Sequence, residues 1–144
     1  MILRLTQGWI FLWAFGDKLF GWSFATKPDQ SWLAGNSPTA GFLTHAPNTI
    51  VHGLAGLAIV DWLFMLGLLG LGLALISGIG LRIAAVTGSL LMIMMWLSLL
   101  PLVNNPIVDE HIIYALLFLL WPQLTSAPQW WLRSTLSKKL SWLN

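Results

Sequence analysis

The chain has 144 residues, of which 57% are hydrophobic and only 8% are charged, and its mean hydropathy is +0.77. A soluble protein of this size could not cover its surface with seven Lys and Arg and five Asp and Glu. The net charge of +2 is too small to indicate nucleic-acid binding, and the lack of cysteine excludes disulfides and thiolate metal sites. We therefore predict an integral membrane protein with no nucleic-acid partner. A soluble helical protein with fully buried helices is the alternative.

Stretches without charged residues locate the membrane spans, because a spanning helix needs about 20 mostly apolar residues. No charged residue occurs in residues 62–81, 83–108 or 112–132. The apolar stretch at residues 3–23 carries charges only near its two ends. We predict an all-α, four-helix transmembrane bundle that forms a single domain over residues 1–144. Its predicted helices cover about residues 3–23, 58–79, 82–101 and 106–124.

The distribution of Lys and Arg predicts the orientation of the bundle. With the N-terminus inside the cell, five basic residues lie on the cytoplasmic side: Arg4, Arg82, Arg133, Lys138 and Lys139. Only Lys18 and Lys27 then lie toward the outside. The same orientation places all the acids and all the histidines in the outer half. We therefore predict a multi-pass protein of the cell membrane with both ends in the cytoplasm and its polar chemistry facing outward.

The first outer connection, residues 25–58, is long, and long loops in compact bundles are often functional. Its sequence predicts a turn at residues 27–29 and a helix start at Asn48. Ser37 and Pro38 resemble a helix cap followed by proline at the first helical position. At the other end of the chain, residues 128–144 alternate apolar and basic side chains, which predicts an interfacial helix on the inner leaflet.

Small residues are concentrated in the second and third predicted helices. Glycine and alanine let helix backbones approach closely inside a membrane. We therefore predict that the second helix packs against the third through these residues, which include Gly67, Gly70, Gly72, Ala84 and Gly88.

Residues 104–111 place three consecutive titratable groups at the membrane boundary. Asn105 is suited to cap the fourth helix and Pro106 to its first position, while Asp109 and Glu110 complement the positive helix end. That structural account leaves His111 unexplained, and Tyr114 follows Glu110 on the same helical face. Ionisable groups at this depth are functional candidates.

The first predicted helix carries Arg4, Gln7, Asp17 and Lys18. Neighbours on a helix do not face each other, so Asp17 and Lys18 are not expected to pair. Asp17 is predicted to turn inward to a group on another helix, while Lys18 either binds a substrate or extends to the membrane surface. Asp61, at the outer end of the second helix, is either a further functional acid or a solvated helix end.

The three histidines do not predict a metal site. His45, His52 and His111 could converge with Asp61 or Glu110, but they lack ligand spacing such as two histidines four residues apart. We expect no bound metal.

Several short motifs occur in an order and spacing similar to one known family. They are residues 4–11 leading to Gly16-Asp17-Lys18-Leu19, residues 37–43, Asp61-Trp62-Leu63-Phe64-Met65, Gly80-Leu81-Arg82-Ile83-Ala84-Ala85, and Asn104-Asn105-Pro106 leading to residues 109–114. Over nearly the whole chain, this pattern resembles the DoxX/DoxD family, and its DoxD branch in particular. The resemblance implies the membrane subunit of a thiosulfate:quinone oxidoreductase, which joins two thiosulfates into tetrathionate and reduces membrane quinone. It also implies a second subunit of the DoxA type.

Under this resemblance, the candidate catalytic residues are Glu110, His111, Asp17 and Asp61, and the candidate substrate-binding residues are Lys18, Arg4 and Tyr114. Carboxylates and imidazoles can supply the two protons that quinone reduction needs, and Trp62 and Trp96 could sandwich its ring. Quinone is then a substrate, and no haem or flavin is expected. Membrane lipids and a second copy of the chain are further expected partners. A non-catalytic anchor or assembly subunit is the main alternative, and a transport role is a more distant one.

Overall fold

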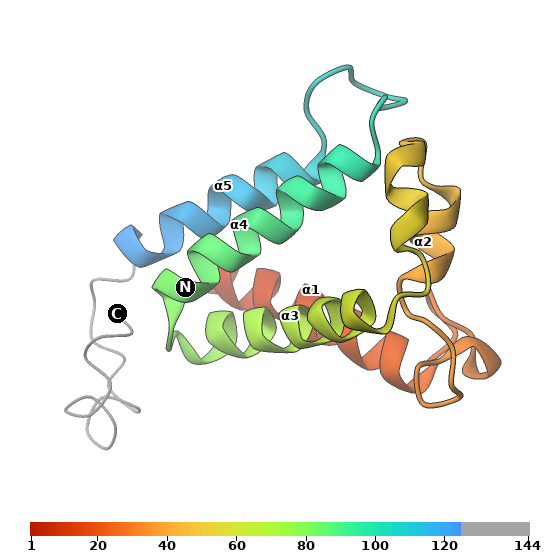
Figure 1. Cartoon of the computed structure of the whole chain (residues 1–144). Coiled ribbons are helices and arrows are strands. Elements are labelled where there is room, and N and C mark those ends of the chain that lie inside the picture. Colours follow the sequence, from red (N-terminus) through yellow and green to blue (C-terminus); the bar gives the residue numbers. More distant parts are fainter. Residues whose placement is uncertain (125–144) are drawn as a thin grey trace.

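The computed structural model describes residues 1–124, and these residues are all-helical with no strand among them. The predicted all-α class is therefore confirmed for this part of the chain, and the predicted interfacial helix at 128–144 lies outside it. Among the described residues, four long helices carry the fold, and three short ones lie between the first two of these (Figure 1). The elements are α1 (Ile2–Phe20), η1 (Pro28–Gln30), α2 (Ala40–His45), η2 (Thr49–Leu54), α3 (Ala58–Ser77), α4 (Leu81–Ser98) and α5 (Glu110–Leu124).

The long helices form two neighbouring pairs (Figure 1). Helix α1 packs along α3, and α4 packs along α5. Successive long helices run in opposite directions, so the connections 21–57 and 99–109 lie at the same end, opposite the N-terminus and the turn at 78–80. Asn48 joins the first connection to the last turn of α4, since its backbone N–H donates to Ser98 O at 3.2 Å and its side chain donates to Leu97 O at 3.0 Å.

Two helices in the described part are long and apolar enough to cross a membrane, namely α3 and α4. Helix α5 is apolar but has only 15 residues, and α1 carries three charged residues. Large apolar side chains remain exposed around these helices, such as Leu63 at 65%, Val86 at 67% and Leu116 at 57%. A helix that is apolar on all sides suits lipid better than water.

Glycines set the distances within each helix pair. A Cβ on Gly72 would lie 2.6 Å from Leu12 Cγ of α1, and a Cβ on Gly88 would lie 2.7 Å from the Phe118 ring of α5. The prediction that glycines join the second helix to the third is therefore wrong for Gly72 and Gly88, although α3 and α4 do contact each other and a Cβ on Gly67 would lie 3.6 Å from Leu91 of α4. At 100° per residue Gly72 and Gly88 face the partner within their own pair, while Gly67 and Gly70 line an open apolar groove of about 600 Å³ between α3 and α4.

The helices occupy the predicted regions but differ at their ends. Helix α5 begins at Glu110 and not near Pro106, because the side chain of Asp109 accepts the N–H groups of His111 and Ile112 and caps the helix there. The side chain of Asn105 instead accepts the N–H groups of Ile107 and Val108, which closes a separate turn.

The short elements of the first connection also lie near their predicted positions. The predicted turn at 27–29 is the helix η1, and η2 begins directly after Asn48, whose side chain accepts the N–H of Ile50. Helix α2 begins at Ala40, and the hydroxyl of Ser37 accepts its N–H at 3.0 Å.

Candidate functional site

The charged residues divide between the two ends of the molecule. Arg4 in the first turn of α1 and Arg82 at the start of α4 lie at the end with the N-terminus. Asp17, Asp61 and the group at residues 109–111 lie at the end that carries the two connections (Figure 1). The candidate catalytic residues therefore share one end of the bundle, but each engages different neighbours.

Asp17 is buried at 2% exposure and holds the turn that follows α1. Its Oδ1 accepts the N–H of Phe24 at 3.3 Å, and its Oδ2 accepts the N–H of Ala25 at 2.9 Å. Gly21 makes the turn possible with φ at 71°, where an added Cβ would lie 2.5 Å from Pro28 Cα. The prediction that Asp17 reaches another helix is wrong, because the chain turns sharply at Gly21 and brings backbone donors back to the carboxylate.

Asp61 is buried at 6% exposure and holds the middle of the first connection. Its Oδ1 accepts the hydroxyls of Ser37 at 2.7 Å and Thr39 at 2.5 Å, and it accepts the N–H of Thr39 at 3.3 Å. The hydroxyl of Ser37 also accepts the N–H of Ala40, the first residue of α2. The first turn of α3 and the start of α2 are thus joined through one carboxylate oxygen.

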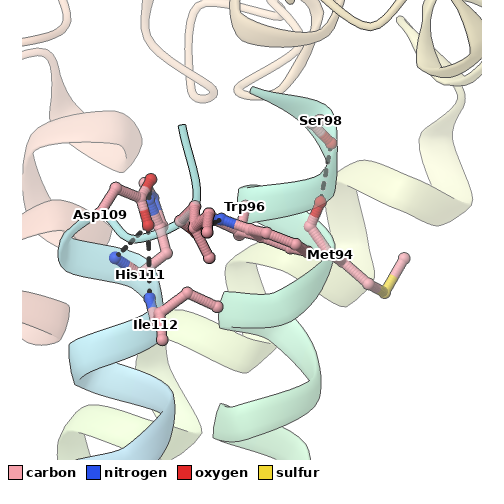
Figure 2. A network of polar contacts seen from close by, with 7 residues as sticks. Met94, Trp96, Ser98, Asp109, His111 and Ile112 are labelled. Atoms are coloured by element: carbon pink, nitrogen blue, oxygen red, sulfur yellow. Dashed lines mark hydrogen bonds and ion pairs between the residues drawn. The ribbon is translucent and has the colours of Figure 1, made fainter. Parts of the chain in front are cut away.

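Asp109 and His111 form an ion pair at the start of α5 (Figure 2). His111 Nδ1 donates to Asp109 Oδ2 at 2.8 Å, while Oδ1 accepts the backbone N–H groups that cap the helix. Burial acts to raise the pKa of the Asp109 carboxyl, but the hydrogen bond and charge of His111 and the two N–H groups hold it below its ordinary value of 3.8. The side chains of Asp109 and His111 are 13% and 12% exposed, so the pair remains in reach of solvent.

Glu110 lies beside this pair and is exposed. The ligand atoms of Asp109, Glu110 and His111 lie within 4.8 Å of one another. Such a donor set could hold a hard cation, and it could equally pass protons between its members. Tyr114, one turn further along α5, packs its ring against Phe11 of α1 at 6.5 Å and is half-buried.

The candidate substrate-binding cations lie far apart along α1. Lys18 Nζ lies 5.9 Å from the centre of the Phe64 ring of α3, and within residues 1–124 it forms no ion pair with Asp17. Arg4 is buried near the opposite end of the helix. One turn along from Arg4, the Gln7 side chain accepts the indole N–H of Trp121 at 2.6 Å. One small anion could not contact both Lys18 and Arg4.

Trp62 and Trp96 do not lie together around one ring site, and the three histidines have separate partners. Trp62 packs edge-on against Trp32 at 4.7 Å, whereas the Trp96 indole donates to Ile107 O at 3.0 Å, beside the Asp109–His111 pair (Figure 2). His45 and His52 each bond a nearby backbone oxygen, of Gly41 and Ala46 respectively. Only His111 joins a group of acids in the described part of the chain.

Two features were missed at the sequence level. One is the role of Ser37 and Thr39 as partners of Asp61, for which the only signal was the predicted cap at Ser37. The other is an open groove of about 500 Å³ on α1, whose lining includes Trp9, Trp13 and Phe24. The spacing of Trp9 and Trp13 by one helical turn was the available signal.

Comparison of the chain with family models, with curated proteins and with solved structures finds no match.

Proposed function

We propose that the chain is a multi-pass membrane protein in which α1, α3, α4 and α5 all cross the bilayer, with the N-terminus and the turn at 78–80 on the cytoplasmic side. The apolar helices α3 and α4 support this arrangement, as do the exposed apolar side chains around the bundle. The orientation rests on the count of Lys and Arg in the sequence, with Arg4, Arg82 and the three basic residues of 133–139 assigned to the cytoplasmic side against Lys18 and Lys27 on the other. The long connection and the Asp109–His111 pair then face outward.

We propose further that it acts as the membrane subunit of a thiosulfate:quinone oxidoreductase-like enzyme of the DoxX/DoxD family, together with a second subunit of the DoxA type. Two thiosulfates lose one electron each and join through a new S–S bond, and the quinone takes up both electrons and two protons. The observation that carries the proposal is the hydrogen-bonded Asp109–His111 pair with Glu110 beside it, at the outer end of the bundle. A group of this kind can supply protons to a membrane quinone.

In this proposal His111 donates to the quinone or its reduced form, Glu110 exchanges protons with solvent, and Asp109 orients the imidazole. Tyr114 lies on the same helix but faces Phe11, so it is a less direct participant. Asp17 and Asp61 both accept hydrogen bonds from the first connection, and we assign them to stabilising that connection. Lys18 is the cation nearest to the outer end of α1 for an anionic substrate, whereas Arg4 lies too far away to share it.

The alternative function is a membrane anchor or assembly subunit without chemistry of its own. It is favoured by the same contacts of Asp17 and Asp61, because both buried acids have structural partners. In that case the Asp109–His111 pair serves as a helix cap.

Reduction of quinone by purified protein with thiosulfate, with and without a DoxA-type partner, tests the proposal. His111→Ala should lower turnover on the order of 10²-fold, because it removes a donor to the reacting group. Glu110→Gln is a second test that spares the fold, since Glu110 is exposed. His45→Ala is the matched control, because His45 is an exposed histidine outside the group.

The anchor function is favoured instead if His111→Ala lowers the unfolding temperature while the folded fraction keeps its specific activity. Unchanged turnover in both His111→Ala and Glu110→Gln would remove the proposed catalytic group altogether.

A further inference from the structure

The buried face of α1 carries two polar side chains near the N-terminus. Arg4 is 6% exposed and Gln7 is 1% exposed, and they lie one helical turn apart. The same face continues at Phe11, whose ring centre lies 5.3 Å from that of Phe118 of α5. Arg4 and Gln7 therefore lie within the bundle, at the end opposite the proposed proton-donating group (Figure 1). The proposed function gives neither of them a role.

The side-chain amide of Gln7 is only half satisfied. Its Oε1 accepts the indole N–H of Trp121 at 2.6 Å, whereas its Nε2 has no hydrogen-bond partner. Exchanging the two amide atoms does not remove the difficulty, because an indole can only donate and needs the oxygen. Within residues 1–124, no other buried side-chain nitrogen or oxygen lacks a partner. An unpaired buried donor is costly, so this amide indicates a bound group that supplies an acceptor.

The unpaired donor lies near one end of α1. Side chains on a helix tilt toward its N-terminus, so the Gln7 side chain extends over the turn that carries Arg4. At 1.5 Å per residue, Arg4 lies roughly 3 Å and Gln7 roughly 8 Å from the start of α1. If α1 spans the bilayer as proposed, both side chains lie close to one membrane surface, where polar head groups begin.

The two side chains together favour an anionic acceptor. A guanidinium excludes a bound cation and is suited to pair with two oxygens of a phosphate. A further oxygen of the same group could accept from the amide N–H of Gln7. Basic pockets between spanning helices on the cytoplasmic side are known to hold anionic lipid head groups in this way.

We propose that Arg4 and Gln7 form a binding site for a phosphate-type oxyanion, with the guanidinium and the amide Nε2 as its donors. The head group of an anionic lipid and free phosphate share this chemistry. The inference goes beyond the proposed function, since it involves neither quinone nor thiosulfate. It rests only on the proposal that α1 crosses the bilayer.

Thermal unfolding of the full chain in lipid nanodiscs tests the proposal without requiring turnover. Three conditions are compared: phosphatidylcholine alone, phosphatidylcholine mixed with phosphatidylglycerol, and phosphatidylcholine with added inorganic phosphate. A ligand that binds only the folded state raises the unfolding temperature, and we expect phosphatidylglycerol to raise it by about 4 °C. Native mass spectrometry of the same proteins counts bound phosphatidylglycerol and does not depend on how each variant unfolds.

Two variants remove the proposed donors separately. Gln7→Glu keeps an oxygen that can accept from Trp121, but it replaces the amide donor with a group that repels an anion. Arg4→Gln removes the positive charge. Each should reduce the rise to less than half and lower the amount of bound phosphatidylglycerol. Arg82→Gln is the matched control, because Arg82 is an exposed arginine at the same end of the bundle, and it should keep the full rise.

An equal rise in the wild type and all three variants would overturn the proposal, because phosphatidylglycerol would then act only through general surface charge. No rise with either phosphatidylglycerol or inorganic phosphate would also overturn it, and water would be the acceptor of the Gln7 amide. An equal rise with inorganic phosphate, lost in Arg4→Gln, would support the site and assign it to the free anion. If Gln7→Glu does not fold, the comparison of Arg4→Gln with Arg82→Gln decides between these outcomes. None of these outcomes depends on thiosulfate oxidation, so the site and the proposed function can fail separately.

Discussion

The acids at the end of the bundle that carries the two connections fall into two groups. Asp17 and Asp61 are almost completely buried, and the groups that hydrogen-bond to their carboxylates are neutral: backbone N–H groups and hydroxyls. Asp109 is partly exposed and its side-chain partner is the imidazole of His111. Two buried carboxylates therefore fix the shape of the first connection, whereas the third belongs to a pair whose charge depends on pH. Depth in the bundle alone does not distinguish a functional acid from a structural one.

The largest loss of stability is expected for Asp61→Ala, and it would test whether this buried acid is structural. The substitution leaves the buried donors of Thr39 and the partly buried hydroxyl of Ser37 without their acceptor, and unpaired buried donors cost about 1–3 kcal/mol each. We expect a loss of about 3 kcal/mol in unfolding free energy, measured by denaturant unfolding in lipid or detergent. Asp61→Asn should lose less, because its amide oxygen can still accept. If activity disappears while stability is unchanged, Asp61 is catalytic and not structural.

A smaller loss is expected for Asp17→Ala. Here two backbone N–H groups lose their acceptor, but both belong to residues at the surface, where water can replace part of the loss. We expect a loss of about 2 kcal/mol, measured by the same unfolding experiment. The turn at residues 24–25 should also become more accessible, which limited proteolysis would detect. Proteolysis unchanged from the wild type would mean that Gly21 and the helix end fix the turn without the carboxylate.

The positions of the long helices could be predicted from the gaps between charged residues. Charged side chains are excluded from the centre of a span, so the gaps between charges located α3 and α4 closely. The ends of the helices were predicted less accurately from the sequence. Asn105-Pro106 has the composition of a helix start, yet Asp109 competes for the same role and its side chain caps α5. Local preferences cannot rank two caps that lie only a few residues apart.

The partners of the buried acids could not be predicted in the same way. Asp61 bonds Ser37 and Thr39, which lie in an irregular connection where no periodicity indicates which side chains face the bundle. The partners of Asp17 are backbone N–H groups, which every residue except proline has, so the sequence carries no mark of them. The partner helix of each glycine could not be predicted either. The number of glycines in these helices indicated close helix packing, but not which helix each glycine faces.

The smallest expected effect is a pH dependence that separates Asp109 from the two buried acids. Because the folded pKa of Asp109 lies below its ordinary 3.8, its charge stabilises the fold above that pH and the stabilisation disappears as the pH falls through the folded pKa. The neutral amide of Asp109→Asn cannot lose such a charge. The stability difference between wild type and Asp109→Asn should therefore be present at pH 5 to 6 and fade below pH 3.8.

The pH-dependent part of the difference in unfolding free energy between the wild type and Asp109→Asn should stay below about 1 kcal/mol. The pair is partly exposed, and a protonated Asp109 still accepts one backbone N–H of the cap. Unfolding of both proteins at matched pH values measures it, and taking the difference removes the titration of the other acids. The Asp61→Asn protein provides the contrast. If the difference in unfolding free energy between the wild type and Asp109→Asn is constant from pH 6 to pH 3, the charge of the Asp109 carboxylate does not stabilise the fold, and the side chain acts only as a hydrogen-bond acceptor. His111 would then add no charge-dependent stability at the start of α5, and the distinction between the paired acid and the buried acids would disappear.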